Sequence, residues 1–206
     1  MPAMQLQVSE LSCIRDDRVL FSGISFTLKS GQALLLEGKN GSGKTSLLRI
    51  LCGFREADKG QLLWCGSVIE NSAYYADMAY VGHLDGIKKE LTVLENLKIA
   101  LALSGTLVSP ITVIEALERV QLSGYDDVFV QTLSAGQKRR LSLARLLIAQ
   151  KPLWILDEPF TSLDKHGIVL IETLMIEHCQ NGGLIVLTSH HDINLHGVNL
   201  QRITLS

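Results

Sequence analysis

Gly38-Lys39-Asn40-Gly41-Ser42-Gly43-Lys44-Thr45 is the stretch that decides the fold of this chain. It matches G-x-x-x-x-G-K-[ST], the pattern of a phosphate-binding loop. The apolar run 33–36 before it predicts a buried strand, and residues 46–51 after it predict a helix that ends near Gly53. Glycines let backbone N–H groups surround phosphate oxygens, and the helix N-terminus adds partial positive charge. We interpret the stretch as a nucleotide site; a glycine-rich turn with a solvated lysine is the alternative.

Two side chains of the loop have expected roles of their own. Lys44 can reach the β- and γ-phosphates of a bound nucleotide. The hydroxyl of Thr45, one residue further on, is placed to bind Mg²⁺. The expected ligands are therefore ATP and Mg²⁺.

The composition bounds the kinds of function that are open to the chain. With 206 residues, of which 47% are hydrophobic, it can form one sizeable core. A net charge of −2 offers no electrostatic footprint for direct binding of nucleic acid. No apolar stretch approaches the roughly 20 residues that span a bilayer, so we expect any membrane association to come through a partner.

Apolar runs and helix signals alternate along the chain and predict an α/β protein. Short buried strands are expected at 78–81, 154–156 and 184–189, each separated from the next by helical segments. Weakly alternating segments between residues 6 and 69 predict an antiparallel β part. We therefore predict a P-loop NTPase core, a mixed sheet flanked by helices, in one domain covering residues 1–206. A helical insert is expected at about 84–150.

Two of these strands end in polar residues that suit phosphate chemistry. The strand at 154–156 is followed by Asp157 and Glu158, and buried carboxylates are costly unless a cation or a proton is handled there. The strand at 184–189 is followed by His190. In an open parallel sheet, ligands bind beyond the carboxyl ends of the strands. The phosphate loop, the carboxylate pair and the histidine should therefore converge on one ATP.

A second helix N-terminus lies at Leu133-Ser134-Ala135-Gly136-Gln137. Ser134 and Gln137 fit the S-x-x-Q capping box, and small residues leave room for an anion at the start of the helix. Taken alone, this pattern is more often just a well-capped helix.

The order of these motifs resembles that of the ATP-binding-cassette (ABC) ATPases. In that family, 38–45 corresponds to the Walker A loop, 133–137 to the signature, 153–159 to the Walker B strand, 162–164 to the D-loop and His190 to the switch histidine. The resemblance covers nearly the whole chain. It implies that the loop Gly38–Thr45 holds the phosphates, with Lys44 on the β- and γ-phosphates.

The resemblance also implies roles for the residues outside the loop. Asp157 would support the Mg²⁺ bound by Thr45, and Glu158 would be the general base for the attacking water. His190 would contact the γ-phosphate. Ser134 and Gly136 would close on the γ-phosphate of a second copy, so that two chains form a two-fold ATP sandwich.

The chain departs from the usual family pattern at several positions. His83 stands where glutamine is common, and an ordinary histidine at a strand end is the alternative reading. Arg15 stands where an aromatic residue usually stacks on adenine; it could stack instead, or be a surface arginine. Ala135 replaces the commoner signature glycine. His191 competes with His190 for the switch role, but neighbouring residues on a strand point in opposite directions, and we assign the role to His190.

Several local details resemble one subgroup, the ATPase subunits of bacterial cytochrome c maturation (haem export) transporters. These details are the segments 20–23, 80–83, 86–88 and 153–161, and His83 agrees with that subgroup. The resemblance implies a peripheral protein on the cytoplasmic face of the bacterial inner membrane, docked on integral-membrane subunits. It would act on haem handling indirectly, by releasing a haem-loaded chaperone.

Other hypotheses remain. An ABC ATPase for another substrate would share all of these motifs. A soluble ATP switch acting on nucleic acid or a ribosome would be expected to show a basic surface, which a net charge of −2 disfavours. A small-molecule phosphotransferase would leave residues 133–137 unexplained.

Overall fold

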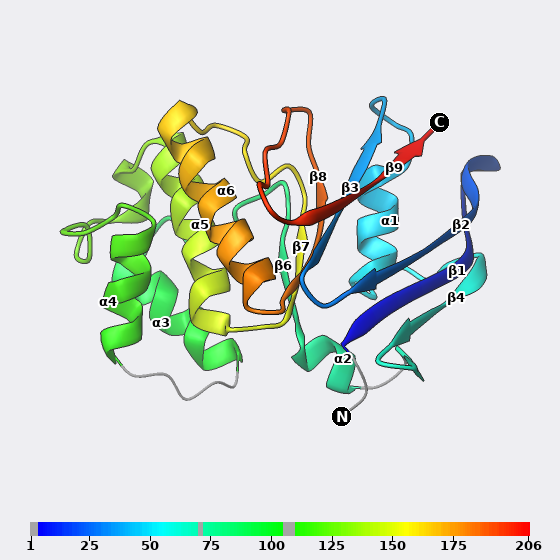
Figure 1. Cartoon of the computed structure of the whole chain (residues 1–206). Helices are drawn as coiled ribbons and strands as arrows, with labels where there is room; N and C mark the ends of the chain where they lie inside the picture. Colours follow the sequence, from blue (N-terminus) through cyan, green and yellow to red (C-terminus); the bar gives the residue numbers. More distant parts are fainter. Residues whose placement is uncertain (1–3, 70–71, 105–109) are drawn as a thin grey trace.

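Two sheets and the helices around them make up the fold (Figure 1). The computed structural model describes residues 4–69, 72–104 and 110–206. One sheet is parallel throughout, in the order β6-β7-β8-β3-β9, and the other is antiparallel, in the order β2-β1-β4-β5. The expected mixed sheet is thus divided into a parallel and an antiparallel sheet. The strands are β1 (Gln5–Arg15), β2 (Arg18–Lys29), β3 (Gln32–Gly38), β4 (Lys59–Trp64), β5 (Ser67–Val68), β6 (Met78–Val81), β7 (Leu153–Leu156), β8 (Leu184–Thr188) and β9 (Asn199–Leu205).

The parallel sheet is buried on both faces because β7 is apolar throughout and β8 is apolar up to its last residue, Thr188. Alternate residues of a strand point to opposite faces. In β7, Trp154 and Leu156 join one hydrophobic cluster, whereas Leu153 and Ile155 join the other. This is why these strands are continuous apolar runs and show no alternation of apolar and polar residues.

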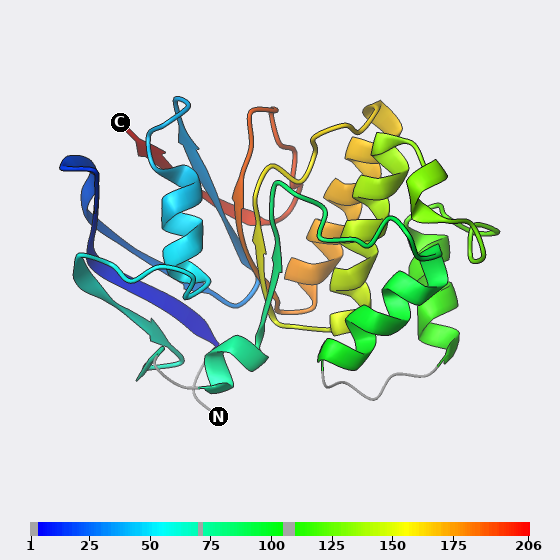
Figure 2. The ribbon, with the colours of Figure 1, turned by 180° about the vertical axis from the view of Figure 1, so that it is seen from behind.

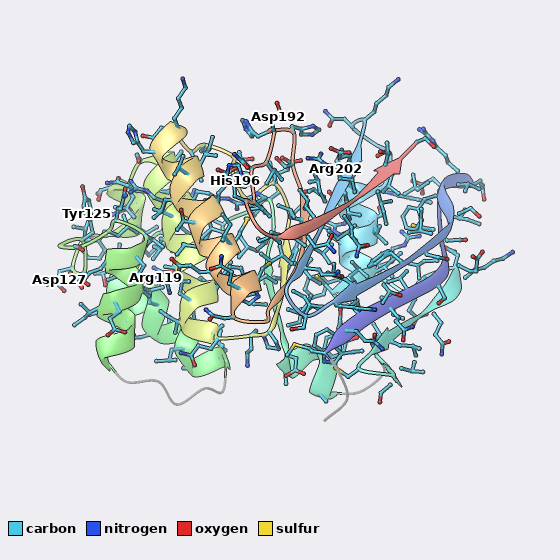
Figure 3. The ribbon with its side chains drawn as sticks, viewed as in Figure 1. Arg119, Tyr125, Asp127, Asp192, His196 and Arg202 are labelled. Carbon is cyan, nitrogen blue, oxygen red and sulfur yellow. The ribbon has the colours of Figure 1, made fainter. Side chains whose placement is uncertain are left out.

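The helices cover the two faces of the parallel sheet unequally. Helix α1 lies between the two sheets, while α3, α4, α5 and α6 gather on the other side (Figures 1 and 2). Arg119 of α4, labelled in Figure 3, forms an ion pair with Glu177 of α6. The helices are α1 (Lys44–Leu51), α2 (Ser72–Ala76), α3 (Val93–Ser104), α4 (Pro110–Arg119), α5 (Ala135–Ala149) and α6 (Lys165–Gln180), with a 3₁₀ turn η1 (Val130–Thr132).

Helix caps define boundaries of three helices, and those at the end of α1 and the start of α5 were expected from the sequence. At the start of α3, Thr92 and Glu95 exchange the two hydrogen bonds of a capping box. Ser134 and Gln137 do the same at the start of α5. Gly53 follows α1 with a φ of 71°, the left-handed conformation that commonly ends a helix.

The weakly alternating N-terminal segment forms one long antiparallel hairpin. Strands β1 and β2 are long and turn at Asp16 and Asp17, both of which have positive φ. Aspartate tolerates this conformation better than most residues, so two neighbouring aspartates suit a tight turn. Irregularities of register between Val8 and Cys13 allow Gly23 to lie within a continuous strand.

The expected helical insert corresponds to α3, α4, η1 and α5, which lie together on one side of the parallel sheet (Figure 1). Residues 105–109, inside the expected range 84–150, lie outside the described residues, as do 1–3 and 70–71 of the expected single domain. The domain division and its limits stay predictions. Strand β9 and helix α2 had no counterpart among the expected elements.

No helix within the described residues is long and apolar enough to cross a membrane.

A half-buried histidine makes the stability of this fold dependent on pH. His178 stacks on Trp154 with ring centroids 3.8 Å apart, and burial lowers the pKa of His178 to about 4. This folded-state pKa lies below the unfolded value of about 6.5, so protons bind the unfolded chain more tightly. Proton binding at His178 does not affect stability above about pH 6.5. Between about pH 7 and pH 5 we expect it to lower the free energy of unfolding by on the order of 2 kcal/mol.

Chemical denaturation at the two pH values measures this effect. His178→Phe is the matched variant, because a phenyl ring can keep the stack on Trp154 and does not titrate. It should show a smaller loss of stability on acidification than the natural chain. Equal losses in the two proteins would rule out His178 as the cause.

Candidate functional site

The carboxyl ends of β3, β7 and β8 lie at one edge of the parallel sheet and border a single pocket of about 520 Å³. The parallel pairing of these strands is the reason that segments far apart in sequence meet there. Figure 3 places Asp192, just beyond β8, at this edge of the molecule. The pocket is lined by Arg15, Leu20, Asn40, Gly41, Gly43, Lys44, Thr45, Ser46, His83, Asp157, Glu158, Thr161 and His190.

The loop between β3 and α1 has a backbone that only glycine can adopt at two positions. Gly38 has a φ of 143°, and a Cβ there would lie 2.4 Å from the carbonyl oxygen of Leu205. Gly43 has a φ of 100°, and a Cβ there would lie 2.9 Å from the ring of Phe21. The loop therefore curls tightly against β9 and β2, and its N–H groups lead into the N-terminus of α1.

Lys44 carries the positive charge of this loop. Its ammonium donates hydrogen bonds to the carbonyl oxygens of Gly38 (2.6 Å) and Lys39 (3.3 Å), and the residue is 8% exposed. The cation is thus held inside the curve of the loop. This is the position from which an ammonium group can reach phosphate oxygens.

Thr45 and Asp157 meet although 112 residues separate them. The hydroxyl of Thr45 donates to Oδ2 of Asp157 at 3.1 Å. The other carboxylate oxygen, Oδ1, accepts from the hydroxyl of Thr188 at 2.7 Å, and Asp157 is 4% exposed. A hydroxyl and a carboxylate side by side are hard oxygen ligands of the kind that Mg²⁺ prefers.

Glu158 and His190 form the second polar pair of the pocket. The backbone N–H of His190 donates to Oε2 of Glu158 at 3.2 Å, and the imidazole Nε2 lies 3.4 Å from Oε1. The backbone N–H of Glu158 donates to the hydroxyl of Thr188 at 2.9 Å. The carboxylate and the imidazole therefore lie side by side in the lining of the pocket.

Two buried polar atoms at this edge of the sheet have no hydrogen-bond partner within the described part of the chain. They are Oγ of Ser42 in the loop and Oε1 of Glu158. A buried polar atom without a partner is costly, so such atoms need an explanation. A phosphate oxygen or a water molecule beside the loop and the carboxylate would supply the missing partners.

Arg15 and His83 are the two candidates at which the chain departs from the usual family pattern. Arg15 and His83 both line the pocket, and His83 also lines an adjoining pocket of about 420 Å³. Arg15 is largely exposed and pairs with Asp16 at 3.4 Å. The described lining includes no Phe, Tyr or Trp ring for a base to stack on, and Arg15 stays a prediction for that role. His190 is among the lining residues and His191 is not, and the switch role of His190 stays a prediction.

Ser134 and Gly136 are not among the residues that line the pocket. Ser134 is exposed, and its hydroxyl accepts the cap hydrogen bond from Gln137 at 3.2 Å. A Cβ at Gly136 would lie 2.9 Å from the carbonyl oxygen of Ser162, so the start of α5 packs closely on the turn after β7. The structure therefore does not support contact of Ser134 or Gly136 with a nucleotide in the pocket of their own chain.

The sequence interpretation missed Thr188 and the minor members of the pocket. Thr188 is fully buried and bonds both Asp157 and Glu158. The available signal was a polar residue at the last position of an otherwise apolar strand. Leu20, Ser46 and Thr161 also line the pocket, and no motif distinguishes them.

Comparison with protein families and named proteins gives a consistent result. The sequence profile described as ABC transporter matches residues 21–161. The chain is 46% identical to the cytochrome c biogenesis ATP-binding export protein CcmA of Vibrio cholerae, over 97% of this chain and 98% of that protein. It is 49% identical to the protein of the same name from Methylococcus capsulatus, over 91% of each chain.

Solved structures agree on the fold. An ABC transporter ATP-binding protein from Pyrococcus furiosus, described as putative, superposes with a TM-score of 0.86, covering 98% of this chain and 97% of that one at 22% identity. A second structure, titled as the ATP binding subunit of an ABC transporter, has a TM-score of 0.81 at 26% identity. It is matched over 90% of this chain and 79% of its own length.

Proposed function

Because this chain belongs to the ABC transporter family and is an ABC ATPase, we propose that it hydrolyses ATP at the pocket beyond β3, β7 and β8. The observation that carries this proposal is the convergence of Lys44, Asp157 and Glu158 on one pocket from two strand ends. ATP binding is the property that the family shares. The export proteins among its relatives favour the transporter hypothesis over a nucleic-acid switch or a phosphotransferase.

The chemistry needs little more than positioning and charge. The N–H groups of residues 38–45 and the ammonium of Lys44 would hold the β- and γ-phosphates. Glu158 would accept a proton from the water that attacks the γ-phosphorus, which makes it the general base. His190, whose imidazole faces Glu158, would contact the γ-phosphate on the same side.

The oxygen ligands at this edge fit Mg²⁺. Thr45 and Asp157 would hold it, and no group of three or more His, Cys, Asp or Glu side chains suited to a metal occurs within the described residues. A site with few protein ligands suits Mg²⁺, which keeps several waters and binds substrate phosphates. When bound, Mg²⁺ would neutralise charge on the β- and γ-phosphates.

A second copy of the chain would complete each site. Ser134 and Gly136 lie at an exposed helix N-terminus and outside their own chain's pocket. In a two-fold arrangement, the same surface of each copy would meet the nucleotide of the other. The γ-phosphate would then bridge the two chains, and its loss on hydrolysis would open them.

We assign the chain to cytochrome c biogenesis on the strength of its relatives. It would lie at the cytoplasmic face of the bacterial inner membrane, bound to integral-membrane subunits, and its ATP hydrolysis would release a haem-loaded chaperone. A surface suited to docking flanks β6, the edge strand of the parallel sheet: pockets of about 420 and 310 Å³ lie beside it. Leu84 and Leu103, 84% and 82% exposed, line one pocket each. Such exposed apolar residues are typical of a partner contact.

Recovery of the tagged chain from detergent-solubilised membranes tests this assignment. We expect a polytopic membrane protein to co-purify with it. Replacing Leu84 and Leu103 by serine should reduce that recovery several-fold while ATP binding is kept, because the two side chains lie outside the nucleotide pocket. Val169→Ser is the matched control, since Val169 is an exposed apolar residue on α6.

A chain that purifies without any membrane partner from its native cell would contradict the transporter assignment. The cytochrome c assignment has its own readout. Cells without the chain should lose covalently haem-loaded c-type cytochromes, as measured by haem staining of gels. Unchanged staining would contradict the cytochrome c assignment and favour the alternative, an ABC ATPase for another substrate.

A further inference from the structure

Arg139 is a buried arginine on α5 that no role above uses. It is 2% exposed and is not among the residues that line the nucleotide pocket. A guanidinium group has five N–H donors in a rigid fork, and here five acceptors surround it. Nε donates to Pro159 O (3.1 Å), Nη1 to Gly82 O (2.9 Å) and Asp85 Oδ1 (3.3 Å), and Nη2 to Asp157 O (2.9 Å) and Glu158 O (2.8 Å).

Three of these acceptors are consecutive backbone carbonyl groups, those of residues 157–159. Along a strand, neighbouring carbonyl groups point in opposite directions, so the chain must bend after β7 to turn all three toward one cation. Glu158 has a φ of 51°, in the left-handed region that residues other than glycine rarely adopt. Such a conformation persists only where its surroundings hold it. Here the guanidinium of Arg139 binds the carbonyl groups of this turn, and the hydroxyl of Thr188 accepts from the N–H of Glu158.

The same guanidinium also reaches the segment that follows β6. It donates to Gly82 O and to the carboxylate of Asp85, two residues that flank His83 in the sequence. Burial lowers the pKa of Arg139, and the neighbouring Asp85 opposes that shift. The guanidinium therefore joins three elements at the pocket's edge: α5, the turn carrying Glu158, and the segment carrying His83.

We propose that Arg139 is a positioning residue for ATP hydrolysis: it sets where the carboxylate of Glu158 lies by holding the backbone of residues 157–159. This rests on the proposed hydrolytic function. No hydrogen bond joins Arg139 to the side chain of Glu158 or to the described phosphate loop. Its loss should therefore slow the chemical step and leave ATP binding largely unchanged, because small displacements of a catalytic group cost rate.

Arg139→Lys is the decisive variant, since it keeps the positive charge and most of the buried stem. A single ammonium nitrogen cannot serve acceptors on both segments as a planar fork does. In the full chain bound to its membrane partner, we expect kcat to fall about tenfold while KM and the equilibrium MgATP affinity stay within about twofold of the natural values. Arg139→Gln should lower kcat further.

Arg140→Gln is the matched control. Arg140 lies on the same helix and donates to the carbonyl oxygens of Val120 and Gln121, and it has no hydrogen bond to residues 157–159 within the described structure. It lines neither the nucleotide pocket nor the two pockets beside β6. Its kcat should stay within about twofold of the natural value. A loss in Arg139→Lys that is absent from Arg140→Gln assigns the effect to the contacts of Arg139.

Three results would overturn the proposal. They are a natural kcat in Arg139→Lys, a parallel loss of MgATP affinity and kcat, and an equal loss in Arg140→Gln. Should the Arg139 variants not fold, Asp85→Asn decides: it weakens one contact of the guanidinium, and kcat should fall about two- to threefold at unchanged affinity. A natural kcat there would also overturn the proposal. Absence of ATP hydrolysis in the natural complex would instead refute the proposed function itself.

Discussion

Glu158→Gln is expected to lower kcat for ATP hydrolysis by roughly 100- to 10,000-fold, the range that general-base catalysis supplies. The amide has nearly the shape of the carboxylate, but it cannot accept the proton of the attacking water. ATP affinity should stay close to the natural value, because Lys44 and the loop 38–45 would hold the phosphates. Single-turnover hydrolysis and equilibrium ATP binding, measured on the same preparation, separate the two effects.

The Glu158→Gln variant should also accumulate as a nucleotide-bound dimer. If the γ-phosphate joins two chains, a site that binds ATP without cleaving it holds them together. Size-exclusion chromatography with light scattering would then show a dimer that depends on MgATP. Glu90→Gln, at an exposed position outside the pocket, is the matched control and should behave as the natural chain.

Turnover at the natural rate in Glu158→Gln would mean that the base has been wrongly assigned. His190 would then be the next group to consider, since its imidazole lies 3.4 Å from the same carboxylate. A Glu158→Gln variant that binds MgATP and stays monomeric would not affect the assignment of Glu158 as the general base. It would argue against the proposed arrangement of two chains around ATP.

Lys44→Ala should weaken ATP binding itself. An ammonium group that donates charge-assisted hydrogen bonds to phosphate contributes about 1.5 to 3 kcal/mol, so we expect ATP affinity to fall by at least about tenfold. Hydrolysis should be lost with it at ordinary ATP concentrations. Titration with a fluorescent ATP analogue, followed by competition with ATP, measures the change.

The effect of Lys44→Ala must be distinguished from damage to the fold. In the structure, Lys44 donates to two carbonyl groups of its own loop, so its removal also changes the loop. Circular dichroism and thermal unfolding should nevertheless show a folded protein, because the hydrophobic clusters on both faces of the sheet do not depend on Lys44. Lys29→Ala, an exposed lysine at the end of β2, is the control. Equal ATP affinity in the Lys44→Ala and natural chains would contradict the role of the loop.

Local sequence determined much of this molecule because the interactions concerned act within a few residues. The loop 38–45 can be recognised from its glycines, whose backbone conformations no other residue adopts easily. The capping boxes of α3 and α5 each join residues three apart, and the buried strands are short apolar runs between breakers. The existence of these elements, and the edge of the sheet where their polar ends meet, could therefore be predicted.

Tertiary structure alone decided the contacts that join distant parts of the chain. The bonds of Thr188 to Asp157, 31 residues away, and of Arg139 to Glu158, 19 residues away, depend on the pairing of β7 with β8 and on how α5 packs. The same is true of the division into two sheets and of the long hairpin that turns at Asp16 and Asp17. A residue's spacing along the sequence specifies its near neighbours, whereas its distant partners are selected only when the whole core packs.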